Sequence, residues 1–194
     1  MKNIMDEWVD VLIEDPAAHT FHIAGKAPRS TVHTKGLLHQ TVHLWILRHT
    51  SNGWQVLMQQ RSSNKESWPN LWDMSVAGHI SSGQTPVAAI LREMREELGI
   101  EKSAADMKFV GSYRLQYNGE FQNQPFRDNE LVYVYTCIDN DIDITTLCLQ
   151  ETEVQAIKWY DIATVYEDLT TSPNTQFCVN PKDVKILMET PLYI

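Results

Sequence analysis

Apolar and polar residues alternate over several short stretches of this chain, and each stretch predicts a β-strand. The stretches at residues 42–47 and 54–60 flank Ser51-Asn52-Gly53, so this part of the chain predicts a hairpin. Further strands are expected at residues 7–13, 74–80, 109–117, 131–138 and 154–160. Irregular segments are expected at residues 17–38, 61–73 and 118–129.

One segment shows the repeat of an amphipathic helix. Residues 86–98 place apolar side chains on one face, at Val87, Ile90, Leu91, Met94 and Leu98. Thr85 is expected to cap this helix, Pro86 to begin its first turn and Gly99 to follow its end. Two more helices are predicted at residues 161–169 and 181–189.

Strands and helices that follow one another in this way predict an α+β or mixed α/β fold, with a mixed β-sheet between helices. A length of 194 residues suits one domain. Within it we expect an N-terminal extension over residues 1–38, a core over 39–170 and a C-terminal helical region over 171–194. No repeat or low-complexity linker indicates a second domain.

Composition narrows the class of protein. The chain is 43% hydrophobic and 21% charged, as is usual for a globular protein, and no apolar run approaches the length of a membrane span. A net charge of -9 disfavours a broad nucleic acid-binding face. Three cysteines that lie far apart in the sequence argue against a disulfide framework. We therefore expect a cytoplasmic protein that binds neither membrane nor nucleic acid.

The predicted helix also carries acidic chemistry. Glu93, Glu96 and Glu97 lie at spacings i, i+3 and i+4, so their carboxylates lie within one turn of each other. Like charges at these spacings destabilise a helix by a few tenths of a kcal/mol per pair, and a hard cation such as Mg²⁺ removes that repulsion. An acidic run of this kind is also common on exposed helices, so the context decides between the two interpretations.

The context resembles the Nudix box, G-x5-E-x7-R-E-U-x-E-E-x-G-U, in which U is a bulky aliphatic residue. The matching residues are Gly78, Arg92, Glu93, Met94, Glu96, Glu97, Gly99 and Ile100. The resemblance implies a Nudix fold and a Mg²⁺ site, with Mn²⁺ as a substitute, on Glu93, Glu96 and Glu97. Gln84 departs from the pattern, because the family has a glutamate there that usually supports the Arg of the box. We expect Gln84 to hold Arg92 through a weaker, uncharged hydrogen bond.

A wider resemblance, over about residues 18–160, connects the chain with isopentenyl-diphosphate isomerase, a branch of the same superfamily. It rests on residues 60–65, 68–72 and 75–79, and it implies Arg29, Arg61 and Lys65 as cations that face the diphosphate. The isomerase needs a cysteine directly before its Gly-His pair, where this chain has Ala77. Alanine transfers no proton, so the resemblance implies an isomerase-like hydrolase rather than an isomerase.

Histidines form part of the same resemblance. His33, His39 and His79 resemble metal-holding histidines of the isomerase, and a second metal site would use them with Asp128 or Glu130. Polar packing or substrate contact is the alternative for all three. Glu153, which precedes the strand predicted at residues 154–160, fits a further glutamate that such families use as a metal ligand or a base.

Together these residues predict a Mg²⁺-dependent hydrolase. Its substrate would be a small phosphorylated metabolite with a diphosphate bond, such as a nucleoside diphosphate derivative. Glu93, Glu96, Glu97 and Glu153 would carry catalysis, while Gly78, Gln84, Arg92 and Gly99 would shape the box. A homodimer is compatible with this interpretation. The alternatives are an isomerase-like enzyme that acts on isoprenoid diphosphates and a weakly catalytic protein that binds a phosphorylated ligand.

Overall fold

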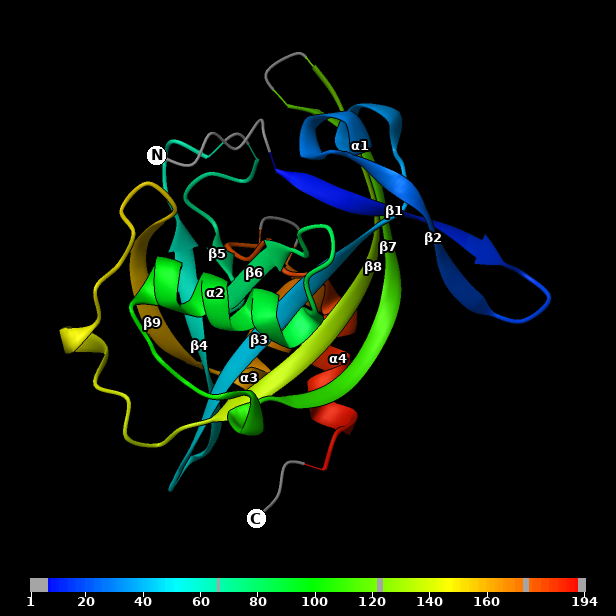
Figure 1. Ribbon diagram of the computed structural model, residues 1–194. Helices are drawn as coiled ribbons and strands as arrows, with labels where there is room; N and C mark the ends of the chain where they lie inside the picture. Colours follow the sequence, from blue (N-terminus) through cyan, green and yellow to red (C-terminus); the bar gives the residue numbers. More distant parts are fainter. Residues whose placement is uncertain (1–6, 66, 122–123, 173–174, 192–194) are drawn as a thin grey trace.

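The computed structural model describes residues 7–65, 67–121, 124–172 and 175–191 (Figure 1). A mixed sheet of seven strands lies at its centre, in the order β5-β4-β3-β8-β7, with β6 paired to β3 and β9 paired to β4. The strands are β3 (His39–Thr50), β4 (Gly53–Arg61), β5 (Trp72–Asp73), β6 (Val76–His79), β7 (Lys108–Phe121), β8 (Gln124–Ile138) and β9 (Val154–Asp161). Strands β3 and β8 run parallel, whereas the other pairs of this sheet are antiparallel.

Helices cover both faces of this sheet, as the fold class predicts. Helix α2 (Pro86–Leu98) packs on one face, and α3 (Ile162–Thr171) and α4 (Pro181–Glu189) pack on the other (Figure 1). An apolar core lies on each face of the sheet, and strand β3 contributes to both. Its residues Val42, Leu44 and Ile46 point to α2, while Trp45 and Leu47 point to the layer of α3 and α4. No helix of the described residues is long and apolar enough to cross a membrane.

The N-terminal part of the chain is more regular than its sequence predicts. Strands β1 (Trp8–Asp15) and β2 (Thr20–Pro28) form a separate two-stranded sheet, and helix α1 (Arg29–Lys35) follows directly. Figure 1 shows the far end of this hairpin pointing away from the main sheet. The prediction of an irregular segment at residues 17–38 is therefore wrong. The side chains of β2 are mostly exposed, so its backbone pairing with β1, and not a buried face, makes it a strand.

The predicted loop at residues 118–129 is also wrong. Strands β7 and β8 extend into this segment as far as residues 121 and 124 and pair with each other, with Tyr117 opposite Asp128 and Gly119 opposite Phe126. Backbone hydrogen bonds between strands do not depend on side-chain polarity. Polar residues whose side chains favour a loop can therefore adopt strand conformation when a partner strand pairs with them. As a result Asp128 and Glu130 lie in a strand next to β3. The hairpin of β3 and β4, and the strand and helices near residues 154–189, agree with the prediction.

Candidate metal and diphosphate site

Helix α2 has the ends that its sequence predicts. The Thr85 hydroxyl accepts a hydrogen bond from the Ala88 N–H at 3.3 Å, and Pro86 occupies the first turn. Gly99 ends the helix with a φ of 69°, a conformation that favours glycine. Ala89, Ile90, Met94 and Leu98 are buried, so the apolar face of the helix is fixed against the sheet. The carboxylates of the helix are therefore held in a defined direction.

The three box glutamates differ in burial. The Glu97 residue is 8% exposed, and Gln59 of β4 donates a hydrogen bond to its Oε2 atom at 3.2 Å. Glu93 is half-buried and lies 2.6 Å from Arg92 Nη1, whereas Glu96 is exposed and lies 3.4 Å from the same atom. Glu93 and Glu97 thus face the body of the protein and Glu96 faces solvent.

Gly78 of β6 makes the close approach of Glu93 feasible. A Cβ atom at this position would lie 2.6 Å from Glu93 Oε1 and 2.7 Å from its Cγ. Any side chain at residue 78 would therefore push Glu93 away from the sheet. This contact explains why the first position of the box is occupied by glycine.

Burial disfavours the charged forms of two glutamates at this end of the helix. Burial, together with the charge of Glu93, raises the pKa of Glu97 from 4.5 to about 8, while Lys65 opposes the shift. Burial likewise raises the pKa of Glu93, against the effect of Arg92. A divalent cation would relieve both effects, since carboxylate oxygens are the ligands that Mg²⁺ prefers. The residues present therefore fit a Mg²⁺ or Mn²⁺ site.

Two further predicted residues lie beside these carboxylates. Lys65 forms an ion pair with Glu153, and the backbone oxygen of Glu153 accepts a hydrogen bond from the Ser62 N–H at 2.8 Å. The charges of both Lys65 and Glu153 act on the pKa of Glu97. The structure thus brings the loop after β4, the turn before β9 and α2 to one place.

The other two predicted cations have partners elsewhere. Arg61 lies 2.9 Å from Asp73 Oδ2, and its Nε donates to the Ser67 backbone oxygen at 3.1 Å. Arg29, the first residue of α1, lies 3.8 Å from Glu7. Arg61 therefore holds the loop that carries Ser67, and its contact with a diphosphate stays a prediction.

The hydrogen-bond partner of Gln84 differs from the one expected from the sequence. Its amide oxygen accepts a hydrogen bond from the Ser81 N–H at 3.4 Å, so it closes its own turn instead of holding Arg92. Arg92 instead contacts Glu93, Glu96 and the His79 backbone oxygen, which lies 3.3 Å from Nη2.

The N-terminal strand supplies contacts that the sequence did not predict. The Ser81 hydroxyl donates to Glu7 at 3.1 Å, and the Ser82 hydroxyl donates to Asp10 at 2.6 Å. The charge of Glu7 also raises the pKa of Arg92, after the larger effects of Glu93 and Glu96. Residues 7–10 thus hold the loop between β6 and α2, and a separation of about seventy residues leaves no local pattern to find it.

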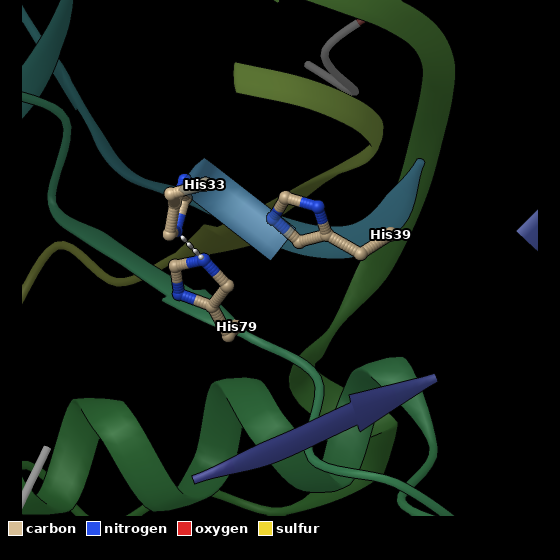
Figure 2. Close-up of side chains that lie close together, drawn as sticks. All are labelled: His33, His39 and His79. Atoms are coloured by element: carbon tan, nitrogen blue, oxygen red, sulfur yellow. Dashed lines mark hydrogen bonds between the residues drawn. The ribbon is translucent and has the colours of Figure 1, made fainter. Parts of the chain in front are cut away.

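A second group of side chains lies at the start of β3. His33 comes from α1, His39 from β3 and His79 from β6, and Figure 2 shows the three rings turned toward one another. One ligand atom of each histidine lies within 4.8 Å of those of the other two, and the Nε2 atoms of His33 and His79 are 3.0 Å apart. The structure brings these three histidines together, and metal binding by them stays a prediction.

Hydrogen bonds orient two of these rings for a cation. His33 Nδ1 lies 2.8 Å from Asp128 Oδ1, and His39 Nδ1 lies 2.9 Å from the Leu37 backbone oxygen. Donation from both Nδ1 atoms leaves the Nε2 lone pairs facing the cluster. His39 Nε2 is buried and has no hydrogen-bond partner among the described residues, and Glu130 Oε1 is 3.7 Å away. Burial holds the pKa of His79 well below its usual value, and a neutral imidazole is the form that binds metals.

Comparison with known proteins agrees with this geometry. The family model of the NUDIX domain matches residues 37–178 of this chain. Nudix hydrolase 3 of Arabidopsis thaliana is 42% identical over 135 residues, which are 68% of this chain but only 17% of that protein. An uncharacterized Nudix hydrolase of Listeria innocua is 33% identical over 80% of this chain and 79% of its own length.

An isopentenyl-diphosphate Delta-isomerase of Escherichia coli is 27% identical over 77% of this chain and 76% of that protein. A crystal structure of a Deinococcus radiodurans protein covers 94% of this chain and 98% of its own, with a TM-score of 0.66 at 18% identity, and so shares the fold. The match to the NUDIX domain spans most of the chain and includes the whole of α2 and its box. The chain therefore belongs to the Nudix family.

Proposed function

We propose that this chain hydrolyses the diphosphate bond of a small phosphorylated metabolite with the help of Mg²⁺, for which Mn²⁺ can substitute. The observation that carries the proposal is the buried carboxylate of Glu97, which lies beside Glu93 and within reach of the Lys65–Glu153 pair. Glu93, Glu96 and Glu97 would hold the cation. A bound divalent cation neutralises phosphate charge and lowers the pKa of a coordinated water.

The chain's own residues would perform the remaining tasks. Lys65 would bind oxygens of the diphosphate, since its ammonium group lies where it can exchange Glu153 for a phosphate. Release of this ion pair would leave Glu153 free to accept a proton from the attacking water. Glu96 and Glu97 are the other candidates to accept the proton of the attacking water. The products would be a phosphate monoester and a second phosphate-bearing fragment.

The test is cleavage by the purified chain with Mg²⁺ of a panel that includes nucleotide sugars, dinucleotides, coenzyme conjugates and isoprenoid diphosphates. Glu97→Gln is expected to abolish nearly all turnover. Glu101→Gln is the matched control, because it removes the same charge from an exposed position just after the helix. Absence of metal-dependent cleavage across the panel, or equal turnover in both variants, would overturn the proposal.

The histidine cluster favours one alternative, an isomerase-like enzyme that acts on isoprenoid diphosphates. His33, His39 and His79 lie near Asp128 and Glu130, as the resemblance to the isomerases implies. Ala77 argues against this alternative, because its methyl group cannot transfer the proton that a cysteine at this position would transfer. Incubation with isopentenyl diphosphate, followed by product analysis, decides between them: an isomer indicates the alternative, and released phosphate indicates hydrolysis.

We also propose that the enzyme acts in the cytoplasm on a small molecule rather than on a nucleic acid. The net charge of -9 supports this, because an acidic surface repels a polynucleotide backbone.

A further inference from the structure

Arg92 contacts two carboxylates that the proposed metal site would use. Its Nη1 atom lies 2.6 Å from Glu93 Oε1 and 3.4 Å from Glu96 Oε2. A cation bound to these glutamates would compete with the guanidinium for the same oxygens, and the two positive charges would repel each other. Arg92 must therefore give up part of this contact when the cation binds.

Arg92 still needs a negative partner after that release. Only 16% of its side-chain surface is exposed, and a mostly buried cation without a counter-charge is unfavourable. The His79 backbone oxygen, 3.3 Å from Nη2, provides a hydrogen bond but no net charge. Gln84 is neutral, and its amide oxygen already accepts the Ser81 N–H at 3.4 Å. A suitable partner is therefore a carboxylate from outside α2.

Glu7 places such a carboxylate beside the same segment. Its Oε1 atom accepts a hydrogen bond from the Ser81 hydroxyl at 3.1 Å, and Ser81 follows His79 by two residues. Two residues of an extended chain span roughly 7 Å, so Glu7 and Arg92 are anchored close together on this segment. Glu7 and Gln84 both bind Ser81, one through its hydroxyl and the other through its N–H.

The charge of Glu7 acts on both members of the Arg92–Glu93 pair. Burial lowers the pKa of Arg92, whereas the charges of Glu93, Glu96 and, after them, Glu7 raise it above its usual value. Burial and the charges of Glu96 and Glu7 raise the pKa of Glu93, against the effect of Arg92. Glu7 thus attracts the guanidinium and repels the Glu93 carboxylate, so it favours separation of the pair.

Several contacts hold Glu7 in this place. Its backbone oxygen accepts a hydrogen bond from the Arg29 N–H at 2.8 Å, and the Ser82 N–H donates to the Trp8 backbone oxygen at 2.8 Å. Arg29 Nη1 lies 3.8 Å from Glu7 Oε2, which is long for an ion pair. A carboxylate accepts several hydrogen bonds, so Oε2 keeps the capacity to bind a second cation.

We infer that Glu7 is a positioning residue of the metal site: it draws Arg92 away from the metal-binding carboxylates and so frees them for the cation. Gln84 fits this assignment, because a second carboxylate beside Ser81 would repel Glu7 and a neutral amide does not. The strand at the start of the described chain thereby takes part in metal binding without supplying a ligand. The inference rests on the metal site of the proposed function and not on the reaction.

Calorimetry of Mg²⁺ binding to the purified chain, without substrate, tests the inference. Mg²⁺ is the probe because it prefers carboxylate oxygens to imidazole nitrogens. Glu7→Gln removes the charge but keeps an oxygen that can accept the bond from Ser81. The Kd of this variant should rise about tenfold, as expected for the loss of one charge-assisted contact.

Asp10→Asn is the matched control. It removes the same charge from a neighbouring contact, since Asp10 accepts a hydrogen bond from the Ser82 hydroxyl at 2.6 Å. The Kd of this control should stay within about threefold of the natural chain. An unchanged Kd in Glu7→Gln, or an equal loss in Asp10→Asn, would overturn the inference.

A cycle with Arg92→Met shows whether Glu7 acts through Arg92. Without the guanidinium Glu7 has no group to draw away, so Glu7→Gln should change the Kd by less than about threefold in this background. A tenfold loss in both backgrounds would mean that Glu7 acts on the cation directly, and it would overturn the inference.

Rescue by Gln84→Glu needs no change at Arg92, in case Arg92→Met does not fold. In the Glu7→Gln background the new carboxylate lies beside Ser81 and should return the Kd to within about threefold of the natural chain. In the natural chain the same substitution places two carboxylates together and should not tighten binding. A double variant that binds as weakly as Glu7→Gln, or equal tightening in both backgrounds, would overturn the inference.

Failure of the proposed function appears separately. A natural chain that binds Mg²⁺ but cleaves no diphosphate of the panel would refute hydrolysis and leave the role of Glu7 standing. A natural chain that binds no Mg²⁺ would overturn both.

Discussion

Replacement of Glu97 by glutamine in the metal-free protein is expected to remove a specific pH dependence of stability. Burial and the nearby charge of Glu93 raise the pKa of Glu97 from 4.5 to about 8 in the folded chain. Between these two values the folded state holds a proton that the unfolded state releases. The stabilisation is therefore complete below the unfolded pKa, and it is lost as the pH rises through the folded pKa.

The size of this loss follows from the shift. Each pKa unit corresponds to about 1.36 kcal/mol, so the natural chain can lose at most about 5 kcal/mol across this window through Glu97. Glutamine stays neutral and can still bond to Gln59 Nε2 through its oxygen, as Glu97 does at 3.2 Å. The variant should match the natural chain near pH 5 and exceed it by a few kcal/mol above about pH 8.

Urea unfolding at a series of pH values, in the presence of a chelator, measures the free energy of unfolding of both proteins. The difference between them isolates Glu97 from the other titrating groups, and Glu101→Gln provides the control for loss of a carboxylate. Parallel stability curves for the natural chain and Glu97→Gln would refute the reasoning. Addition of Mg²⁺ should stabilise the natural chain more at high pH than at low pH, because the cation binds the deprotonated carboxylate.

Three other outcomes are expected. Glu96→Gln should lower Mg²⁺-dependent turnover by orders of magnitude with an unchanged circular dichroism spectrum, and near-normal turnover would remove Glu96 from the metal site. Lys65→Met should raise KM about tenfold through loss of a charged contact to phosphate, which steady-state kinetics would detect, and an unchanged KM would place Lys65 in a structural role only. His39→Ala should lower the amount of Mn²⁺ bound at equilibrium by one ion per chain, and unchanged stoichiometry would leave the histidines as polar packing.

Local patterns predicted the centre of the site well. The spacing of Glu93 and Glu97 and the residues at the two ends of α2 are properties of one short segment, so the sequence alone contains them. The hairpin of β3 and β4 is local in the same sense. These features depend on residues that lie within a few turns or one loop of each other.

The features that were missed depend on distant parts of the chain. The hydrogen-bonded side chains of His43 and Asp183 are 140 residues apart in the chain, and those of Ser81 and Glu7 are 74 apart, so no local periodicity connects them. Strand β2 and the polar ends of β7 and β8 were missed for a related reason. Their strand conformation comes from backbone pairing with a partner strand, which the polarity of their own side chains does not reveal.

The contacts of residues 7–10 with the loop before α2 bear on where this domain can be cut. The match to the family begins at residue 37, after these contacts. A truncated protein or a chimera that starts there would keep every residue of the Nudix box. It would lose the bond from Ser82 N–H to the Trp8 backbone oxygen at 2.8 Å and the two bonds to Asp10. Recombination at the family boundary would thus transfer α2 without the segment that holds the loop before it.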